Sequence, residues 1–120
     1  MRILHASFLV SNLEASHRFY GELLGLQIDE ERPDLGFRGT WYWLESGQQI
    51  HLIEIPDENA GRIHPGHGGR DRHVAFSVND LEAISSKLVA AKIPFTMSRS
   101  GRRALFCRDP DGNALEFVET

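Results

Sequence analysis

The sequence predicts an α+β fold in which one βαβββ unit occurs twice along the 120-residue chain. Residues 72–83 alternate apolar with small or polar side chains, as in a half-buried strand, and then begin a helical pattern. The same pattern occurs 68 residues earlier, where His5 occupies the position of His73. A second match, at an offset of 65 residues, relates residues 50–54 to residues 115–119. An internal repeat of this kind predicts that the fold contains two copies of one structural unit.

In the first half, residues 11–14 have the spacing of a capping box, Ser-Asn-Leu-Glu, so a helix should begin there. Apolar residues recur at helical spacing as far as Gly25, which ends the helix because glycine tolerates the left-handed conformation. Residues 33–39 are rich in turn-forming residues and should form a link. Strands are expected at residues 3–10, 26–31, 40–45 and 49–55.

In the second half, residues 56–69 hold several glycines and prolines and should form a long connecting loop, a candidate lid. Asn79 or Asp80 caps a second helix, which ends before Pro94. Residues 109–113, Asp-Pro-Asp-Gly-Asn, have the chemistry of a turn. Strands are expected at residues 72–78, 94–97, 103–108 and 114–119.

Length and composition indicate one globular domain, with module one at residues 1–55, the connecting loop at 56–70 and module two at 71–120. Apolar residues make up 41% and charged residues 25%, which is ordinary for a soluble domain. The net charge of −4 argues against nucleic acid or an anionic membrane as a partner. No apolar run approaches the roughly 20 residues that span a bilayer.

Two further observations predict a cytoplasmic location. The chain enters a strand pattern directly after Met1, with no signal-peptide pattern. Its single cysteine, Cys107, has no partner for an internal disulfide, as is usual in a reducing compartment. Nothing nearby in the sequence activates this thiol, so we expect it to be inert.

The repeat brings residues of metal-ligand type to equivalent positions. His5 pairs with His73, and His51 pairs with Glu116. Taken singly, each histidine would be interpreted as structural or exposed, and the carboxylate as solvated. Taken together, two ligand-type residues in each module indicate a metal site.

The donor set favours a particular kind of ion. Three imidazoles and one carboxylate suit a borderline divalent transition metal such as Zn, Ni, Co, Mn or Fe, whereas Ca and Mg prefer oxygen ligands. Four protein ligands leave two positions of an octahedron for two neighbouring oxygens of a substrate. A shell of charge −1 around an ion of +2 would stabilise a developing enolate or alkoxide.

Sequence motifs along the whole chain strengthen this interpretation. They are Leu13-Glu14, Phe19-Tyr20, Leu24-Gly25-Leu26, Arg72-His73-Val74-Ala75-Phe76, Arg108-Asp109-Pro110-Asp111-Gly112-Asn113 and Leu115-Glu116-Phe117. With these motifs the chain resembles the vicinal oxygen chelate superfamily, which includes glyoxalase I, methylmalonyl-CoA epimerase, extradiol dioxygenases, fosfomycin-resistance enzymes and bleomycin-binding proteins. It looks closest to a glyoxalase-like branch.

The resemblance implies a fold, a site and an assembly. Paired βαβββ modules would form a cupped, largely antiparallel sheet around a metal held by His5, His51, His73 and Glu116. Short glyoxalases of a single domain imply a homodimer, with His5 and His51 from one chain and His73 and Glu116 from the other. The implied function is lyase or isomerase chemistry on a small molecule through an enediolate.

One departure from the glyoxalase pattern matters for mechanism. Many glyoxalase I enzymes have a carboxylate where this chain has His51, so Glu116 is the single carboxylate of the set and the expected catalytic base. His5, His73 and Glu116 alone would also suit an extradiol-type dioxygenase, although those chains are usually longer. A third alternative is a non-catalytic binding protein of the bleomycin type, which does not need the four ligands.

Substrate-binding residues are predicted from arginines and aromatics near these positions. A clamp for a carboxylate or phosphate of an anionic substrate would use arginine, and the alternative is a solvated basic loop. Tryptophans on one face of a strand would wall the cavity, and the alternative is a place in the core. The candidates are Arg70, Arg72, Arg102, Arg103, Trp41 and Trp43. His64 and His67 are expected in a solvated loop.

Overall fold

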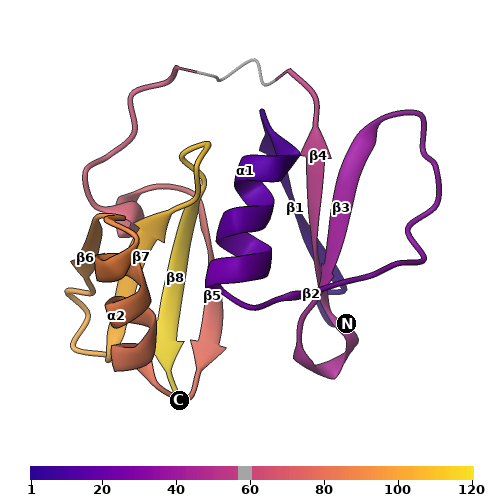
Figure 1. Ribbon diagram of the computed structural model, residues 1–120. Coiled ribbons are helices and arrows are strands. Elements are labelled where there is room, and N and C mark those ends of the chain that lie inside the picture. The colour runs from indigo at the N-terminus through magenta and orange to yellow at the C-terminus, as the bar shows by residue number, and fades with distance from the viewer. Residues whose placement is uncertain (57–60) are drawn as a thin grey trace. The chain divides into compact units, whose positions relative to one another are not determined.

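The computed structural model describes residues 1–56 and 61–120, which divide into two compact units, residues 1–61 and residues 62–120. Each unit contains one four-stranded mixed sheet with a helix packed on it (Figure 1). The predicted α+β class, with βαβββ occurring twice, is confirmed. Among the described residues, no helix is long and apolar enough to cross a membrane.

The first unit has the strand order β1-β4-β3-β2, in which β1 pairs with β4 in parallel and the other two pairings are antiparallel. Its helical segment is an α-helix that continues as a π-helix. Its elements are β1 (His5–Val10), α1 (Leu13–His17), the π-helix η1 (Arg18–Leu23), β2 (Gln27–Ile28), β3 (Arg38–Trp43), the 3-10 turn η2 (Glu45–Gly47) and β4 (Gln49–Glu54).

The second unit repeats this topology with the order β5-β8-β7-β6, and β5 is again parallel to its neighbour β8. The other pairings, β7 with β8 and β6 with β7, are antiparallel. Its elements are the 3-10 turn η3 (Gly68–Arg70), β5 (His73–Val78), α2 (Leu81–Ala90), β6 (Phe95–Met97), β7 (Ala104–Arg108) and β8 (Ala114–Glu119).

The structure differs from the expected elements mainly at their ends. The strand expected at residues 26–31 is reduced to two residues, and the strand expected at 40–45 starts at Arg38 and ends at Trp43. The connecting loop is expected at 56–69, of which 57–60 lie outside the described residues. Its last part is packed rather than free, because a Cβ on Gly68 would lie 3.2 Å from the Phe106 Cβ.

Strand alternation separates each sheet into a helix side and an opposite side. On the helix side, Tyr42 and Ile50 of the first unit and Leu105 and Leu115 of the second are buried. This burial supplies the hydrophobic stabilisation of each unit. The candidate ligands alternate with these residues along the strands, so they lie on the side opposite the helix. We call this face the ligand side.

The two helices begin in the same way. The side-chain oxygen of Asn12 accepts a hydrogen bond from the Ala15 N–H at 2.9 Å, and that of Asp80 accepts from the Ala83 N–H at 3.1 Å. Each residue has extended backbone angles, as a helix N-cap requires. The predicted cap of the second helix, Asp80, is therefore confirmed, whereas the first helix is capped by Asn12 and not by Ser11, the first residue of the expected capping box.

A second shared contact ties each helix start to the last strand of its unit. The Glu54 carboxylate accepts from the Leu13 N–H at 2.8 Å, and the Glu119 carboxylate accepts from the Leu81 N–H at 2.9 Å. Each carboxylate also pairs with an arginine on the neighbouring strand or just before it. These pairs are Arg38 with Glu54 at 3.0 Å and Arg103 with Glu119 at 2.7 Å.

Candidate functional site

In the second unit, strand register brings His73 and Glu116 together. His73 pairs with Ala114 in the parallel ladder between β5 and β8, so Glu116 stands two residues further along on the same face. The imidazole Nε2 lies 3.3 Å from the Glu116 Oε2, and this carboxylate is only 3% exposed. Its other oxygen, Oε1, accepts from the Arg102 Nη2 at 3.1 Å.

The orientation of His73 is fixed by its other ring nitrogen. Its Nδ1 lies 2.8 Å from the main-chain carbonyl oxygen of Asp71. A carbonyl oxygen only accepts, so Nδ1 carries the proton and, in the neutral ring, Nε2 presents its lone pair. This lone pair faces the Glu116 carboxylate, and two acceptors at this distance need a proton or a cation between them. The pair therefore fits a metal-binding role.

In the first unit, the same register aligns His5 with His51. His5 pairs with Gln49 in the parallel ladder between β1 and β4, so His51 again stands two residues further along. The two imidazoles stack with centroids 4.0 Å apart and an interplanar angle of 12°. Trp41 pairs with His51 across β3 and β4, and its ring stacks on the imidazole at 4.2 Å.

The protonation of His51 is set by a chain of hydrogen bonds. The Gln49 side-chain amide donates to the Asp29 Oδ2 at 2.8 Å, so its carbonyl oxygen faces the His51 Nε2, also at 2.8 Å. His51 therefore donates through Nε2 and keeps a lone pair on Nδ1. Burial, followed by the charges of His5 and Arg32, lowers the pKa of His51 to about 4. The ring is neutral at pH 7, as a metal ligand must be.

Each unit thus contributes two of the four predicted ligands. Over residues 1–56 and 61–120, no three or more His, Cys, Asp or Glu side chains gather closely enough to hold a metal by themselves. The donor chemistry of the two pairs, three imidazoles and a carboxylate, still suits a borderline divalent ion.

The predicted substrate-binding residues fall into two groups. Arg102 contacts Glu116 and Trp41 contacts His51, so both lie at predicted ligands. Trp43 occupies the same strand face as Trp41 and is 42% exposed. Arg103 instead pairs with Glu119, whose carboxylate binds the start of α2 on the helix side.

The remaining two candidates, Arg70 and Arg72, lie on either side of Asp71 before β5. Both residues are exposed. Arg70 ends the 3-10 turn η3, and the Arg72 N–H donates to the Asp71 Oδ1 at 2.9 Å. Both are near His73 in sequence, and the structure shows no contact of either guanidinium with that ring.

Two histidines expected in a solvated loop are instead held in the second unit. The His67 Nδ1 bonds the Thr96 hydroxyl at 2.6 Å, and its ring meets Phe106 edge-on. Phe106 also meets the His73 ring edge-on at 5.2 Å. His64 bonds the Asp71 carboxylate at 3.1 Å. The contacts with Thr96 and Phe106 join residues far apart in sequence, and only the glycine-rich spacing of residues 66–69 indicated close packing.

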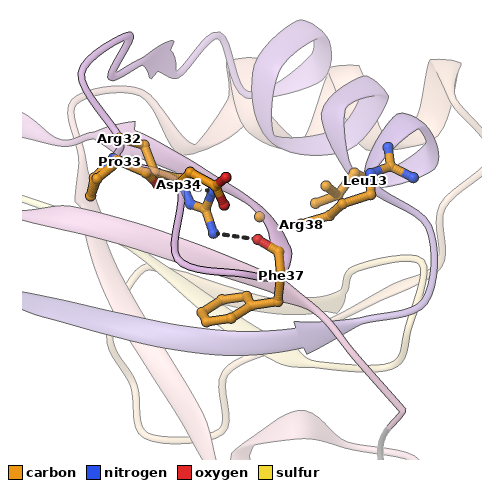
Figure 2. Close-up of a pocket in the computed structure, with 7 residues that line it drawn as sticks. Leu13, Arg32, Pro33, Asp34, Phe37 and Arg38 are labelled. Atoms are coloured by element: carbon orange, nitrogen blue, oxygen red, sulfur yellow. Dashed lines mark hydrogen bonds between the residues drawn. The ribbon is translucent and has the colours of Figure 1, made fainter.

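A surface pocket of about 480 Å³ lies in the first unit, beside the start of α1 (Figure 2). The Arg32 guanidinium donates to the Phe37 carbonyl at 3.1 Å and lies 5.4 Å from the centre of that ring. Gly39 leaves room for it, because a Cβ there would be 2.7 Å from the Arg32 Nη2. The pocket is lined by Leu13, Arg32, Pro33, Asp34, Phe37, Arg38 and Gly39. None of these is a predicted ligand.

Comparison with known proteins assigns the chain to a family. Residues 2–117 match the Glyoxalase/Bleomycin resistance protein/Dioxygenase superfamily. The chain belongs to this superfamily. Its match covers nearly the whole length, both units included, and the resemblance noted in the sequence motifs is confirmed.

Relatives of this superfamily member cover almost the whole chain. Lactoylglutathione lyase of Haemophilus influenzae is 29% identical over 126 residues, which span 99% of this chain and 93% of that protein. The uncharacterized protein YwkD of Bacillus subtilis is 31% identical over 123 residues, 98% of this chain and 95% of its own. A glyoxylase/bleomycin resistance protein/dioxygenase domain from Frankia superposes with a TM-score of 0.76 at 26% identity. The superposition covers 99% of this chain and 97% of the Frankia chain.

Proposed function

We propose that this glyoxalase-superfamily chain is a metal-dependent enzyme of the lyase or isomerase type. It would bind a divalent transition ion such as Zn, Ni, Co, Mn or Fe through His5, His51, His73 and Glu116. The substrate would be a small molecule with two neighbouring oxygens, one of them a carbonyl. The relative named lactoylglutathione lyase, which spans the same length, supports this reaction class.

The observation that carries the proposal is the pairing of His73 with Glu116. The imidazole is held with its Nδ1 proton on the Asp71 carbonyl, and its Nε2 lone pair faces a nearly buried carboxylate at 3.3 Å. Such an arrangement needs a proton or a cation between the two acceptors, and only the carboxylate is almost completely buried.

The chain's own groups supply the proton transfer. Glu116 is the single carboxylate of the set and would take a proton from one substrate carbon and return it to the neighbouring carbon. Arg102 holds the Glu116 Oε1, so Oε2, the oxygen that faces His73, would move off the ion to make this transfer. The Arg102 side chain is 61% exposed, so it is also placed to contact an anionic group of the substrate. A bound divalent ion would polarise the two substrate oxygens and offset the enediolate charge.

The test follows solvent deuterium into the substrate carbon during interconversion of lactoylglutathione with its thiohemiacetal isomer. Wild type loaded with metal should exchange the proton, and Glu116→Gln should slow exchange by about 10²–10⁴-fold, the usual contribution of a positioned base. Ser77→Ala, an exposed change on the same strand face as His73, is the matched control. Full exchange in Glu116→Gln would assign the base elsewhere. Oxygen consumption with a catechol would favour the dioxygenase alternative.

We further propose a homodimer that shares its metal sites between chains. Each unit offers two ligands on one sheet face, so two units must meet at one ion. His5 and His51 of one chain would join His73 and Glu116 of the other, and twofold symmetry would create two equivalent sites. Mixing His5→Ala chains with Glu116→Ala chains should restore one intact site per mixed dimer and partly recover metal binding. A monomer that binds metal at full occupancy would contradict this assembly.

A further inference from the structure

The second unit contains a partly buried ionic cluster that the proposed reaction does not use. The Asp71 carboxylate, only 6% exposed, accepts from the Arg108 Nη1 at 2.9 Å and from the Arg62 Nη2 at 2.9 and 3.1 Å. The His64 Nδ1 lies 3.1 Å from the same carboxylate. These four residues are named the Asp71 clamp. Burial alone would raise the pKa of Asp71, but these hydrogen bonds outweigh it and hold that pKa well below its usual range.

Arg108 makes the clamp a junction between two chain segments. It donates to the carbonyl oxygens of Gly112 at 2.8 Å and of Pro65 at 2.7 Å, as well as to Asp71. Gly112 has positive φ, and a Cβ there would lie 2.7 Å from the His64 Nε2. The clamp therefore fixes residues 62–71 against the turn that follows β7. Any other residue at position 112 would displace His64.

We infer that the Asp71 clamp is a positioning device for His73. The same residue that is clamped through its carboxylate receives the His73 Nδ1–H on its main-chain carbonyl at 2.8 Å. The Asp71 Oδ1 also accepts from the Arg72 N–H at 2.9 Å. This N–H and the Asp71 carbonyl belong to one planar peptide unit, so the bond helps to orient the carbonyl. Fixing the carboxylate therefore fixes the tautomer and the direction of the His73 Nε2.

This inference rests on the proposed function in one respect, that His73 is a metal ligand. A second hydrogen bond that orients a ligating histidine typically changes metal affinity by about 10–100-fold when it is lost. The geometric part does not depend on metal, because the tautomer of His73 is a property of the metal-free protein. The two parts are therefore measured separately.

The experiment records long-range ¹H–¹⁵N spectra of the histidine rings in the metal-free protein at pH 8.5, with His73→Gln used to assign the signal. In wild type, His73 should be the Nδ1–H tautomer. Arg108→Met should move it toward a mixture of tautomers and weaken Zn²⁺ binding by about 10–100-fold. Arg18→Met, which removes one exposed arginine of α1's continuation, should change neither.

A conservative variant separates positioning from folding. Arg108→Lys keeps the charge beside Asp71 but cannot donate to three acceptors from one planar group, so an intermediate tautomer ratio is expected. If Arg108→Met fails to fold, this variant decides the question. Wild-type tautomer and Zn²⁺ affinity within twofold of wild type in the folded variants would overturn the inference. A wild-type chain that binds no metal would overturn the proposed function, and the tautomer shift would still decide the role of the clamp.

Discussion

The two units share one architecture on the helix side of their sheets and differ on the ligand side. On the helix side, Asn12 and Asp80 cap the helices, and Glu54 and Glu119 bind the helix starts, at almost equal distances. On the ligand side, the first unit has stacked imidazoles beside a tryptophan, whereas the second has an imidazole facing a carboxylate and an arginine. The helix side therefore serves stability in both units, and the units differ in the predicted ligands on the opposite side.

The orienting partners of the two ligand pairs also differ. In the first unit, a side-chain amide and a carboxylate, Gln49 and Asp29, set the tautomer of His51. In the second, a main-chain carbonyl held by the Asp71 clamp sets that of His73. The register of the strands gives both units the same ligand spacing, but the partners behind each ligand come from unrelated positions.

The largest expected effect is on the helix side, where Ile50 and Leu115 occupy equivalent positions. Both are fully buried, so Ile50→Ala and Leu115→Ala should each lower the free energy of unfolding by about 2–5 kcal/mol. Urea unfolding, monitored by circular dichroism, measures this loss of free energy. Ser77→Ala serves as the exposed control. A loss below about 1 kcal/mol in one variant alone would break the equivalence of the two cores.

An intermediate effect is expected at alkaline pH, because each unit buries a weak acid whose pKa is raised. Burial raises the pKa of Tyr42 to about 12, and burial with the charge of Asp109 raises that of Cys107 to about 12. The unfolded chain would lose these protons near their ordinary values of 10.0 and 9.0. Their stabilisation is therefore complete below pH 9 and is lost as the pH rises toward 12.

Urea midpoints measured between pH 8 and 11 test this pH dependence. Cys107→Ala and Tyr42→Phe should each flatten part of the alkaline decline relative to wild type, because each removes one group with a raised pKa. The comparison of slopes cancels the titration of exposed lysines, which is common to all three proteins. If the urea midpoints of both variants fell with pH in parallel with wild type, the raised pKa values of Cys107 and Tyr42 would not explain the alkaline decline.

The smallest expected effect concerns the helix caps. Asn12→Ala and Asp80→Ala should each destabilise the protein by about 1 kcal/mol, since each leaves a helix N–H without its acceptor. Asp80→Asn keeps the acceptor and should lose much less. Zn²⁺ affinity should remain unchanged in all three variants, because the caps lie on the helix side. A parallel loss of Zn²⁺ binding would show that the two sides are coupled.

Sequence reasoning predicts the repeated topology and the ligand pairs because both follow from local alternation. Strand parity places His73 and Glu116 on the face opposite the helix. The same parity separates Arg102, which reaches Glu116, from Arg103, which reaches Glu119. The sequence offers the two arginines as equivalent candidates, since the start of β7 is uncertain by one residue from pattern alone.

The residues that orient the ligands could not be predicted in this way. Asp29 reaches His51 only through Gln49, and Arg108 reaches Asp71 from 37 residues away. Such contacts depend on the tertiary fold and leave no periodic signal in the sequence. His64 and His67 lie in a glycine-rich stretch that is typical of a solvated loop, and hydrogen bonds to Asp71 and Thr96 hold them in place.

Zinc stoichiometry measures the central claim most directly. Metal-free chain equilibrated with Zn²⁺ and freed of excess should retain about one ion per chain, since four ligands form one site. His51→Ala, from the first unit, and His73→Ala, from the second, should each lose most of it, while Ser77→Ala keeps it. If both histidine variants kept as much Zn²⁺ as wild type, or if wild type bound none, a metal centre built from the two units would be contradicted.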